Sequence, residues 1–173
     1  SVVPIEWKFW KINLLDTPGY LDFAGEVDEA LAAADGAIIV INGKAGVEAG
    51  TEKAWAYCEK YGIPRVFFVT NMDDEHADYM KVVDQLRDLY GKRIAPFHLP
   101  IREDHKFTGV VNVVTLKGRR FTGGGKWEER DVPDDVQDDL EPCREALMEA
   151  VAETSEEYME RYFDGGEFTV DEI

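Results

Sequence analysis

Three predicted strands, each followed by a segment with helical spacing, constrain the fold of this chain more than any other feature. The first of these strands ends at residue 15, the others cover residues 37–41 and 65–69, and the helices expected after them cover about 22–33, 48–61 and 75–90. Gly62 follows the second helix with Pro64 beyond it, and Gly91 follows the third, as at ordinary helix ends. The alternation predicts an α/β fold with a parallel sheet and right-handed crossovers.

The strands themselves differ in pattern. Residues 2–15 alternate apolar and polar side chains and predict two strands that meet near residues 7–10. Residues 37–41 form a continuous apolar run, which is typical of a parallel strand covered on both faces. Residues 65–69 predict another buried strand.

A second part with a different pattern begins after about residue 95. Residues 107–116 and 119–131 alternate like antiparallel strands, and Gly123-Gly124-Gly125 predicts a hairpin turn between two of them. A helical region should follow to about residue 163, with an interruption at Pro142 and a new helix cap in residues 154–157. We therefore expect two domains, residues 1–95 and a small α+β unit of residues 96–173.

The acidic charge is concentrated near the end of the chain. The 19 Lys and Arg against 36 Asp and Glu give a net charge of 19 − 36 = −17, and 45% hydrophobic residues are enough for a packed core. Residues 126–173 hold 4 basic and 18 acidic side chains, a net of 4 − 18 = −14. Such a surface repels phosphate backbones, so direct nucleic-acid binding by this third is disfavoured. It is either a solvated face or a docking surface for a basic partner.

Several functional classes are excluded by simple features. No run approaches the roughly 18 apolar residues of a membrane span, and the first residues do not resemble a signal peptide. Cys58 and Cys143 fit no metal or redox spacing, so we expect buried thiols in a reducing, cytoplasmic environment. His76, His98 and His105 have no acidic or cysteine neighbour at ligand spacing, so none is expected to bind a metal.

The first candidate site is Asp16-Thr17-Pro18-Gly19, directly after a predicted strand. Ligands of open parallel sheets bind at the carboxyl ends of the strands. There a carboxylate can reach the shell of a Mg²⁺ ion, and a glycine lets a backbone N–H approach a phosphate. An ordinary strand-to-helix turn with Asp16 as its cap fits these residues equally well.

The second candidate site is the segment of residues 69–74, which follows the third parallel strand. Asp73 can accept hydrogen bonds from a base ring that offers two N–H groups. A capped loop between strand and helix is the alternative, and it stays open.

Residues 12–43, including Asp16-Thr17-Pro18-Gly19-Tyr20-Leu21-Asp22-Phe23, resemble the translational GTPases. The spacing to Met72-Asp73 and to residues 77–79 narrows the resemblance to bacterial elongation factor G. Residues 99–101, 107–114 and 150–162 resemble the inserted subdomain of that family, so the resemblance covers essentially the whole chain. It implies an incomplete P-loop-GTPase-like sheet with an inserted α+β subdomain.

The resemblance also implies roles for single residues. Asp16 would lie in the outer shell of Mg²⁺, Gly19 would contact the γ-phosphate, and Asp73 would pair with the guanine edge. The full set of implied nucleotide-binding residues is Asp16, Thr17, Pro18, Gly19, Tyr20, Thr70, Asn71, Met72 and Asp73.

Two positions depart from the family pattern. The family has a histidine after Asp-Thr-Pro-Gly, where it orients the attacking water as a catalytic residue, and this chain has Tyr20. The guanine motif Asn-Lys-Met-Asp becomes Thr70-Asn71-Met72-Asp73, without the usual asparagine and lysine. A register shifted by one would keep Asn71 and end at Asp74, but the first register preserves the downstream match and is preferred.

Two elements of the family do not occur in these residues. The sequence contains no Gly-x-x-x-x-Gly-Lys-Ser/Thr phosphate loop, and the first switch is missing. We expect the chain to be a piece from the middle of the first domain of a longer protein. The full-length parent would use GTP, GDP and Mg²⁺, whereas this piece alone should bind no cofactor and be inactive.

The resemblance implies part of an elongation factor G-like GTPase that acts on the ribosome in translocation, in the cytoplasm and without a membrane partner. It suggests the ribosomal stalk protein as the partner of the acidic third. A ribosomal protection-type paralogue and a non-hydrolysing ribosome- or partner-binding module are the alternatives.

Overall fold

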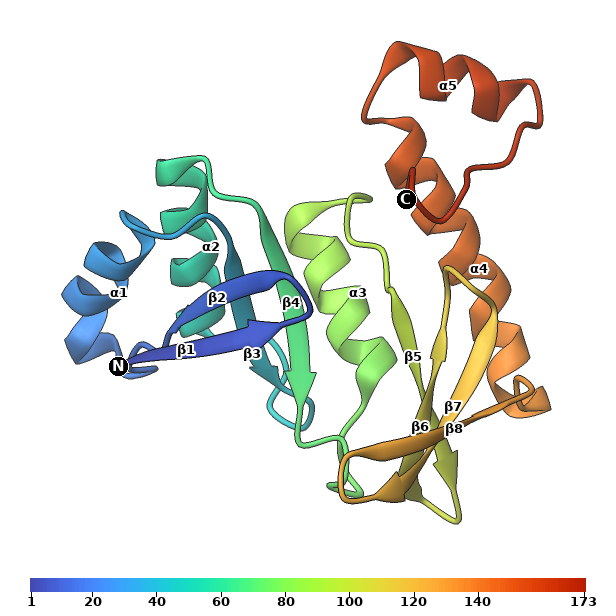
Figure 1. Cartoon of the computed structure of the whole chain (residues 1–173), viewed down its shortest axis with the longest axis horizontal. Helices are drawn as coiled ribbons and strands as arrows, with labels where there is room; N and C mark the ends of the chain where they lie inside the picture. The colour runs from blue at the N-terminus through green and yellow to red at the C-terminus, as the bar shows by residue number, and fades with distance from the viewer. The chain divides into compact units, whose positions relative to one another are not determined.

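The computed structural model describes the backbone of residues 1–173 and every side chain except that of Leu21. The chain divides into two compact units, Ser1–Thr70 and Asn71–Ile173, which are described separately (Figure 1). Sequence analysis expects a boundary near residue 95, between a partial GTPase domain and an inserted subdomain. The two compact units divide the chain by packing and so do not test that boundary. That boundary stays a prediction.

The first unit contains two small sheets. Its elements are β1 (Val2–Trp7), β2 (Trp10–Leu15), a 3₁₀ turn (Leu21–Phe23), α1 (Ala24–Leu31), β3 (Ala37–Asn42), α2 (Ala49–Tyr61) and β4 (Arg65–Thr70). β1 and β2 form an antiparallel hairpin, whereas β3 and β4 are parallel neighbours that α2 connects. The prediction that β2 belongs to the parallel sheet is wrong for the described chain, because all six residues of β2 pair with β1 and with no other strand.

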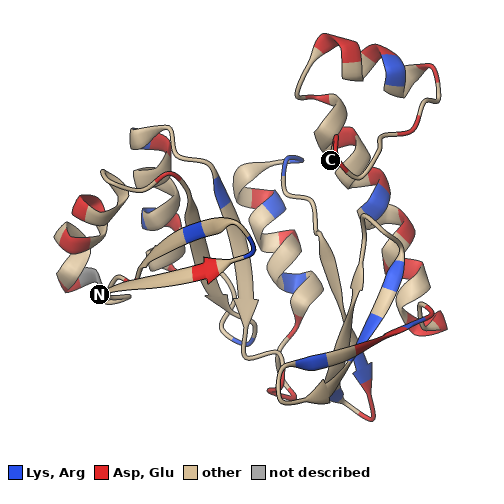
Figure 2. Ribbon diagram, viewed as in Figure 1, with Lys and Arg blue, Asp and Glu red and all other residues tan. Residues whose placement is uncertain are grey.

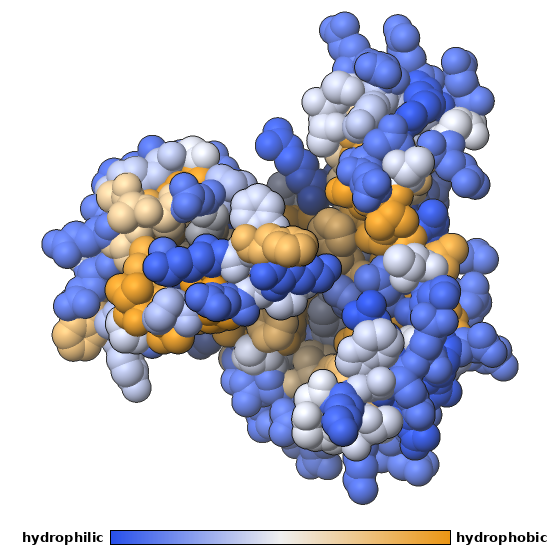
Figure 3. Space-filling model, in the orientation of Figure 1, coloured by the Kyte–Doolittle hydropathy of each residue, from blue (hydrophilic) through white to orange (hydrophobic). Residues whose placement is uncertain are grey.

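Only one face of the β3–β4 sheet is covered. Helix α2 packs against β3, and Ile39 and Ile41 are buried. The apolar side chains of the opposite face are each more than half exposed: Ile38, Val40, Val66 and Phe68. Burial of both strands on both faces was therefore a wrong prediction, because a covering element is present on one side only. Figure 3 shows that apolar side chains reach the surface of the first unit.

The second unit contains α3 (Tyr79–Tyr90) and, after it, antiparallel strands and helices of the kinds predicted beyond residue 95. The elements after α3 are β5 (His98–Glu103), β6 (Lys106–Asn112), β7 (Lys117–Gly123), β8 (Lys126–Arg130), α4 (Asp134–Ala152) and α5 (Glu156–Phe163). The four strands form an antiparallel sheet in the order β5-β6-β7-β8, with the predicted glycine turn between β7 and β8. Sequence analysis missed β5, which contains Pro100. An edge strand tolerates proline because one of its sides needs no N–H donor.

Two boundaries moved because polar side chains bind nearby backbone groups. Helix α3 starts at Tyr79, four residues later than expected, because the Asp78 carboxylate accepts the N–H of Lys81 at 3.0 Å and caps the helix. Strand β6 ends at Asn112, whose Oδ1 accepts the N–H of Thr115 at 2.8 Å and starts a turn.

The core of the second unit lies between α4 and the β5–β6 side of the sheet. Its buried members are Leu99, Ile101, Val111, Val113, Val136, Leu140, Cys143 and Leu147. The predicted interruption at Pro142 is wrong, since α4 is continuous from Asp134 to Ala152. Leu140 and Cys143 are buried on either side of the proline, and this packing offsets its cost of about 3 kcal/mol. Ser155 caps α5 as expected, because its hydroxyl accepts the N–H of Tyr158 at 3.1 Å.

None of the described helices has the length and apolar character that crossing a membrane requires. The two cysteines are unpaired and buried, as expected.

Candidate functional site

The segment Asp16–Tyr20 leaves the open end of the β1–β2 hairpin. The backbone N–H of Asp16 donates to the carbonyl of Ser1 at 2.8 Å, and the Ser1 hydroxyl donates to Asp16 Oδ2 at 3.2 Å. The Asp16 side chain is otherwise exposed. The Tyr20 carbonyl accepts the N–H of Phe23 at 3.0 Å and starts the turn into α1, while the Tyr20 ring is 78% exposed.

Gly19 presents an open backbone. Among the described residues, no heavy atom apart from those of its chain neighbours lies within 4 Å of the position that a Cβ would occupy there. Thr17 is exposed and Pro18 is half-buried. An exposed carboxylate and an accessible glycine fit Mg²⁺ and a phosphate, respectively, so these residues are compatible with the roles predicted for them.

The carboxyl ends of β3 and β4 lie side by side. Asn42 is the register partner of Thr70, and the N–H of Gly43 donates to the Thr70 carbonyl at 2.9 Å. The Thr70 hydroxyl donates to the carbonyl of Ile41 at 3.2 Å. Asn42 Oδ1 accepts the N–H of Lys44 at 2.9 Å and shapes the turn that follows β3. Thr70 therefore uses its side chain within the sheet, and Asn42 is a structural residue that sequence analysis did not single out.

The loop of residues 71–78 begins the second unit. Asn71 has a φ of 57°, a left-handed conformation that asparagine tolerates well. Met72 is buried, whereas the Asp73 side chain is exposed, and none of the described residues hydrogen-bonds to its carboxylate. Asp74 Oδ1 accepts the N–H of His76 at 2.8 Å. Asp73 is thus the more exposed of the two carboxylates, and the choice between the two registers stays a prediction.

Arg102, near the end of β5, contacts this loop from a distant part of the sequence. Its Nη2 donates to the carbonyl oxygens of Met72 at 2.7 Å, Asp74 at 3.2 Å and Ala77 at 3.2 Å. Its Nη1 donates to the carbonyl of His105 at 3.1 Å. Sequence analysis missed Arg102. The one signal in the sequence was an arginine two residues before the turn, at a polar position of a strand whose buried positions are Leu99 and Ile101.

The two candidate segments belong to different units. Residues Asp16 to Tyr20 and Thr70 lie in the unit of residues 1–70, whereas Asn71, Met72 and Asp73 begin the unit of residues 71–173. The predicted assignment of both segments to one nucleotide site therefore stays a prediction.

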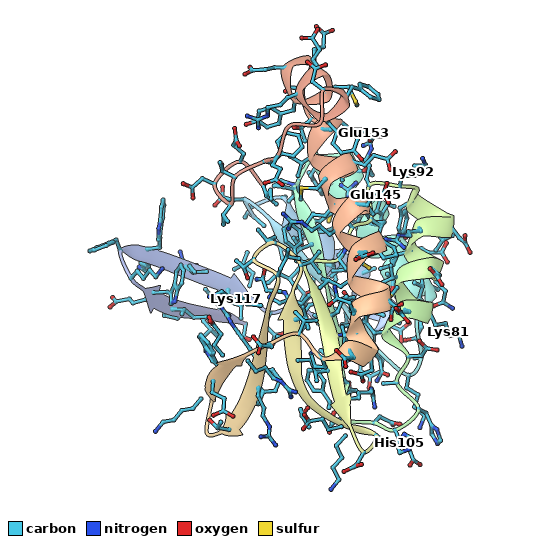
Figure 4. The ribbon with its side chains drawn as sticks, turned by 90° about the vertical axis from the view of Figure 1, so that its right-hand side faces the viewer. Lys81, Lys92, His105, Lys117, Glu145 and Glu153 are labelled. Atoms are coloured by element: carbon cyan, nitrogen blue, oxygen red, sulfur yellow. The ribbon has the colours of Figure 1, made fainter. Side chains whose placement is uncertain are left out.

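The acidic third forms an exposed face on α4 and α5 (Figure 2). Glu145 and Glu153 are exposed along α4, and Figure 4 labels both beside Lys92. Glu149 is half-buried, and its carboxylate forms an ion pair with Lys92 at 3.2 Å. The positive charge of Lys92 partly offsets the negative charge that Glu149 adds to this face. Helix α4 ends at Ala152, and Glu153 keeps a helical conformation as its C-cap.

Comparisons with known proteins agree with this geometry. Residues 1–161 match the family described as the elongation factor Tu GTP-binding domain. Elongation factor G of Chlamydia caviae and of Chlamydia trachomatis serovar D are each 38% identical to this chain over 138 residues, 78% of this chain and 20% of each relative. The chain thus spans about a fifth of the length of the curated relatives it matches.

A crystal structure of a Thermus thermophilus protein shares the fold, with a TM-score of 0.89 and 37% sequence identity. The match covers 99% of this chain and 26% of that protein. These findings confirm the α/β fold of a partial GTPase domain and the resemblance to elongation factor G. The chain belongs to the family of the elongation factor Tu GTP-binding domain.

Proposed function

We propose that this chain is part of an elongation factor G-like translational GTPase that acts on the ribosome in translocation, in the cytoplasm. The observation that carries the proposal is the similarity to elongation factors G over 138 residues. Because the relatives named above are elongation factors G, this function is favoured over that of a ribosomal protection-type paralogue.

In this proposal, the full-length protein binds GTP or GDP with Mg²⁺. The Asp16 carboxylate would lie in the outer shell of the ion, the Gly19 N–H would donate to the terminal phosphate, and the Asp73 carboxylate would accept from the guanine edge. When bound, Mg²⁺ would neutralise charge on the phosphate oxygens and so assist transfer of the γ-phosphoryl group to water. Tyr20 occupies the position of the family's histidine. In this proposal its phenol oxygen would orient the attacking water in place of an imidazole.

The Asp73 role can be tested by base preference in the full-length protein. An Asp73→Asn change replaces one acceptor oxygen by an NH₂ donor. It should therefore weaken the binding of guanosine diphosphate and strengthen that of xanthosine diphosphate, whose base has a carbonyl in place of the amino group. Asp74→Asn is the matched control, and it should leave the base preference unchanged. A change of preference in Asp74→Asn rather than in Asp73→Asn would support the shifted register.

The chain alone should bind neither GTP nor GDP usefully. Its sequence lacks the phosphate loop that supplies most backbone N–H contacts and a lysine to the phosphates. Isothermal titration of the 173-residue chain with Mg²⁺ and GDP should show no binding. Low-micromolar affinity would contradict this expectation.

A non-hydrolysing ribosome- or partner-binding module is the second candidate. Tyr20 at the position of the family's histidine, together with Thr70 and Asn71 in the guanine motif, favours it. Ribosome-stimulated GTP hydrolysis by the full-length protein separates the two functions, because only the first predicts turnover.

We also propose that the acidic face docks the basic part of the ribosomal stalk protein. Opposite charges speed the encounter, and salt screens this attraction. Binding in a pulldown should therefore weaken at high salt and be lost when Glu145, Glu149 and Glu153 are all changed to lysine. Changing Glu26, Glu29 and Glu52 to lysine alters the net charge equally and should leave binding intact. Equal effects of the two triple variants would show that net charge alone matters.

A further inference from the structure

Arg102 connects two parts of the second unit that are far apart in sequence. Its guanidinium binds three carbonyl oxygens of the loop that contains Asp73 and one carbonyl of the β5–β6 turn. The side chain is half-buried, so water competes less for these hydrogen bonds than at a fully exposed position. The contact is therefore a structural link between the hairpin and the loop.

The hairpin geometry directs Arg102 toward the loop. The register shifts between Ile101 and Arg102, since Ile101 pairs with Gly109 and Arg102 with Phe107. Such a bulge bends the strand locally and changes the direction of neighbouring side chains. Asp104 and His105 form the turn with φ values of 49° and 65°, as two-residue hairpin turns require. The position of the guanidinium thus follows from the strand pairing.

The contacts hold the backbone on both sides of Asp73. The carbonyls of Met72 and Asp74 accept from the same nitrogen, whereas the Asp73 side chain is exposed and has no hydrogen-bond partner among the described residues. A carboxylate that receives two parallel N–H groups of a base must have one orientation. A loop already held in that orientation loses less conformational freedom when the base binds.

We propose that Arg102 is a positioning residue for guanine recognition, which it supports by holding the Asp73 loop in its base-receiving conformation. The inference rests on the proposed function, since it assumes that Asp73 binds the base. The planar guanidinium suits this position because its several N–H groups can serve the loop and the turn together, which a single ammonium cannot do equally well.

The loop contact is tested first in the 173-residue chain by hydrogen exchange with mass spectrometry. Arg102→Met removes the donors and keeps an unbranched apolar side chain. We expect amides of residues 71–78 to exchange about fivefold faster or more, because the loop opens more often. Arg120→Met is the matched control, because Arg120 is exposed and forms longer ion pairs, with Glu103 at 3.6 Å and with Glu128 at 3.9 Å. It should leave loop exchange unchanged.

Base discrimination is then measured in the full-length protein with guanosine and inosine diphosphates. Inosine keeps the ring N–H but lacks the amino group at position 2, so the affinity ratio reports the second hydrogen bond to Asp73 and not folding or phosphate binding. We expect Arg102→Met to lower this ratio by about tenfold, because guanosine diphosphate depends on two hydrogen bonds to Asp73 and inosine diphosphate on one. Arg102→Lys, which keeps the charge, should fall between Arg102→Met and the unchanged protein, and Arg120→Met should keep the full ratio.

The outcomes separate the inference from the function beneath it. An unchanged ratio in Arg102→Met, or an equal loss of both nucleotides, overturns the positioning role while Asp73 recognition stands. An unsubstituted protein that does not prefer guanosine over inosine diphosphate overturns the proposed guanine recognition, and the role of Arg102 falls with it. Unchanged loop exchange in Arg102→Met also overturns the inference.

Discussion

Replacing Gly109 by alanine should destabilise the second unit strongly. Gly109 lies in β6 opposite Arg120 of β7, and an added Cβ would lie 2.0 Å from the Arg119 carbonyl oxygen. Ordinary contacts of this kind begin near 3.4 Å, so the strands would have to separate by 3.4 − 2.0 = 1.4 Å. The obstacle is backbone and not the end of a flexible side chain, so it cannot move away alone.

The expected cost follows from this displacement. A separation of that size takes the neighbouring N–H···O contacts between β6 and β7 beyond hydrogen-bond length. Two lost ladder bonds at about 1 kcal/mol each, with about 1–2 kcal/mol for strained packing, give a loss of about 3–4 kcal/mol in the free energy of unfolding. Val111, two residues along β6, is fully buried, so the strain would reach the core.

Urea denaturation followed by hydrogen exchange can assign the loss to the correct unit, because peptides from residues 1–70 and 71–173 report separately. Gly50→Ala is the control. Gly50 lies in α2, and in the described part of the chain no heavy atom outside its own helix backbone and its chain neighbours lies within 4 Å of its Cβ position. Gly50→Ala should therefore leave the free energy of unfolding unchanged or raise it by up to about 1 kcal/mol. A loss below about 0.5 kcal/mol in Gly109→Ala would show that the sheet relaxes easily and would refute this reasoning.

Three further predictions concern catalysis, thiol reactivity and pH. In the full-length protein, Tyr20→His should speed ribosome-stimulated hydrolysis by about tenfold, or ~1.4 kcal/mol of barrier, and an unchanged kcat would contradict a role in water orientation. Burial raises the pKa of Cys58 and of Cys143, so iodoacetamide should label both much more slowly in the native chain than in urea, as measured by intact mass. The hydrogen bond from Arg130 lowers the pKa of Glu103, so this pair stabilises the fold above the unfolded pKa of about 4.3 and loses its contribution as the pH falls through the lower folded value. Glu103→Gln should therefore flatten the acid side of a plot of urea stability against pH, and an unchanged slope would contradict the assignment.

Local signals predicted a large part of the fold. The order of strands and helices, the left-handed Gly62 after α2, the Ser155 cap and the glycine turn after β7 all depend on residues close in sequence. Such features follow from local backbone preferences and nearby hydrogen bonds, which a single sequence displays directly. The candidate residues Asp16 and Asp73 could likewise be identified, because each follows a recognisable apolar strand.

The sequence by itself thus predicted most of the elements, with the exception of β5, and singled out the candidate site residues. Tertiary structure decided what each element packs against: β2 pairs only with β1, one face of β3–β4 is open, and α4 passes through Pro142 without a break. It also decided that Arg102 binds the Asp73 loop. These features depend on contacts between residues distant along the chain, whose energies outweigh local preferences and leave no periodic signal in the sequence.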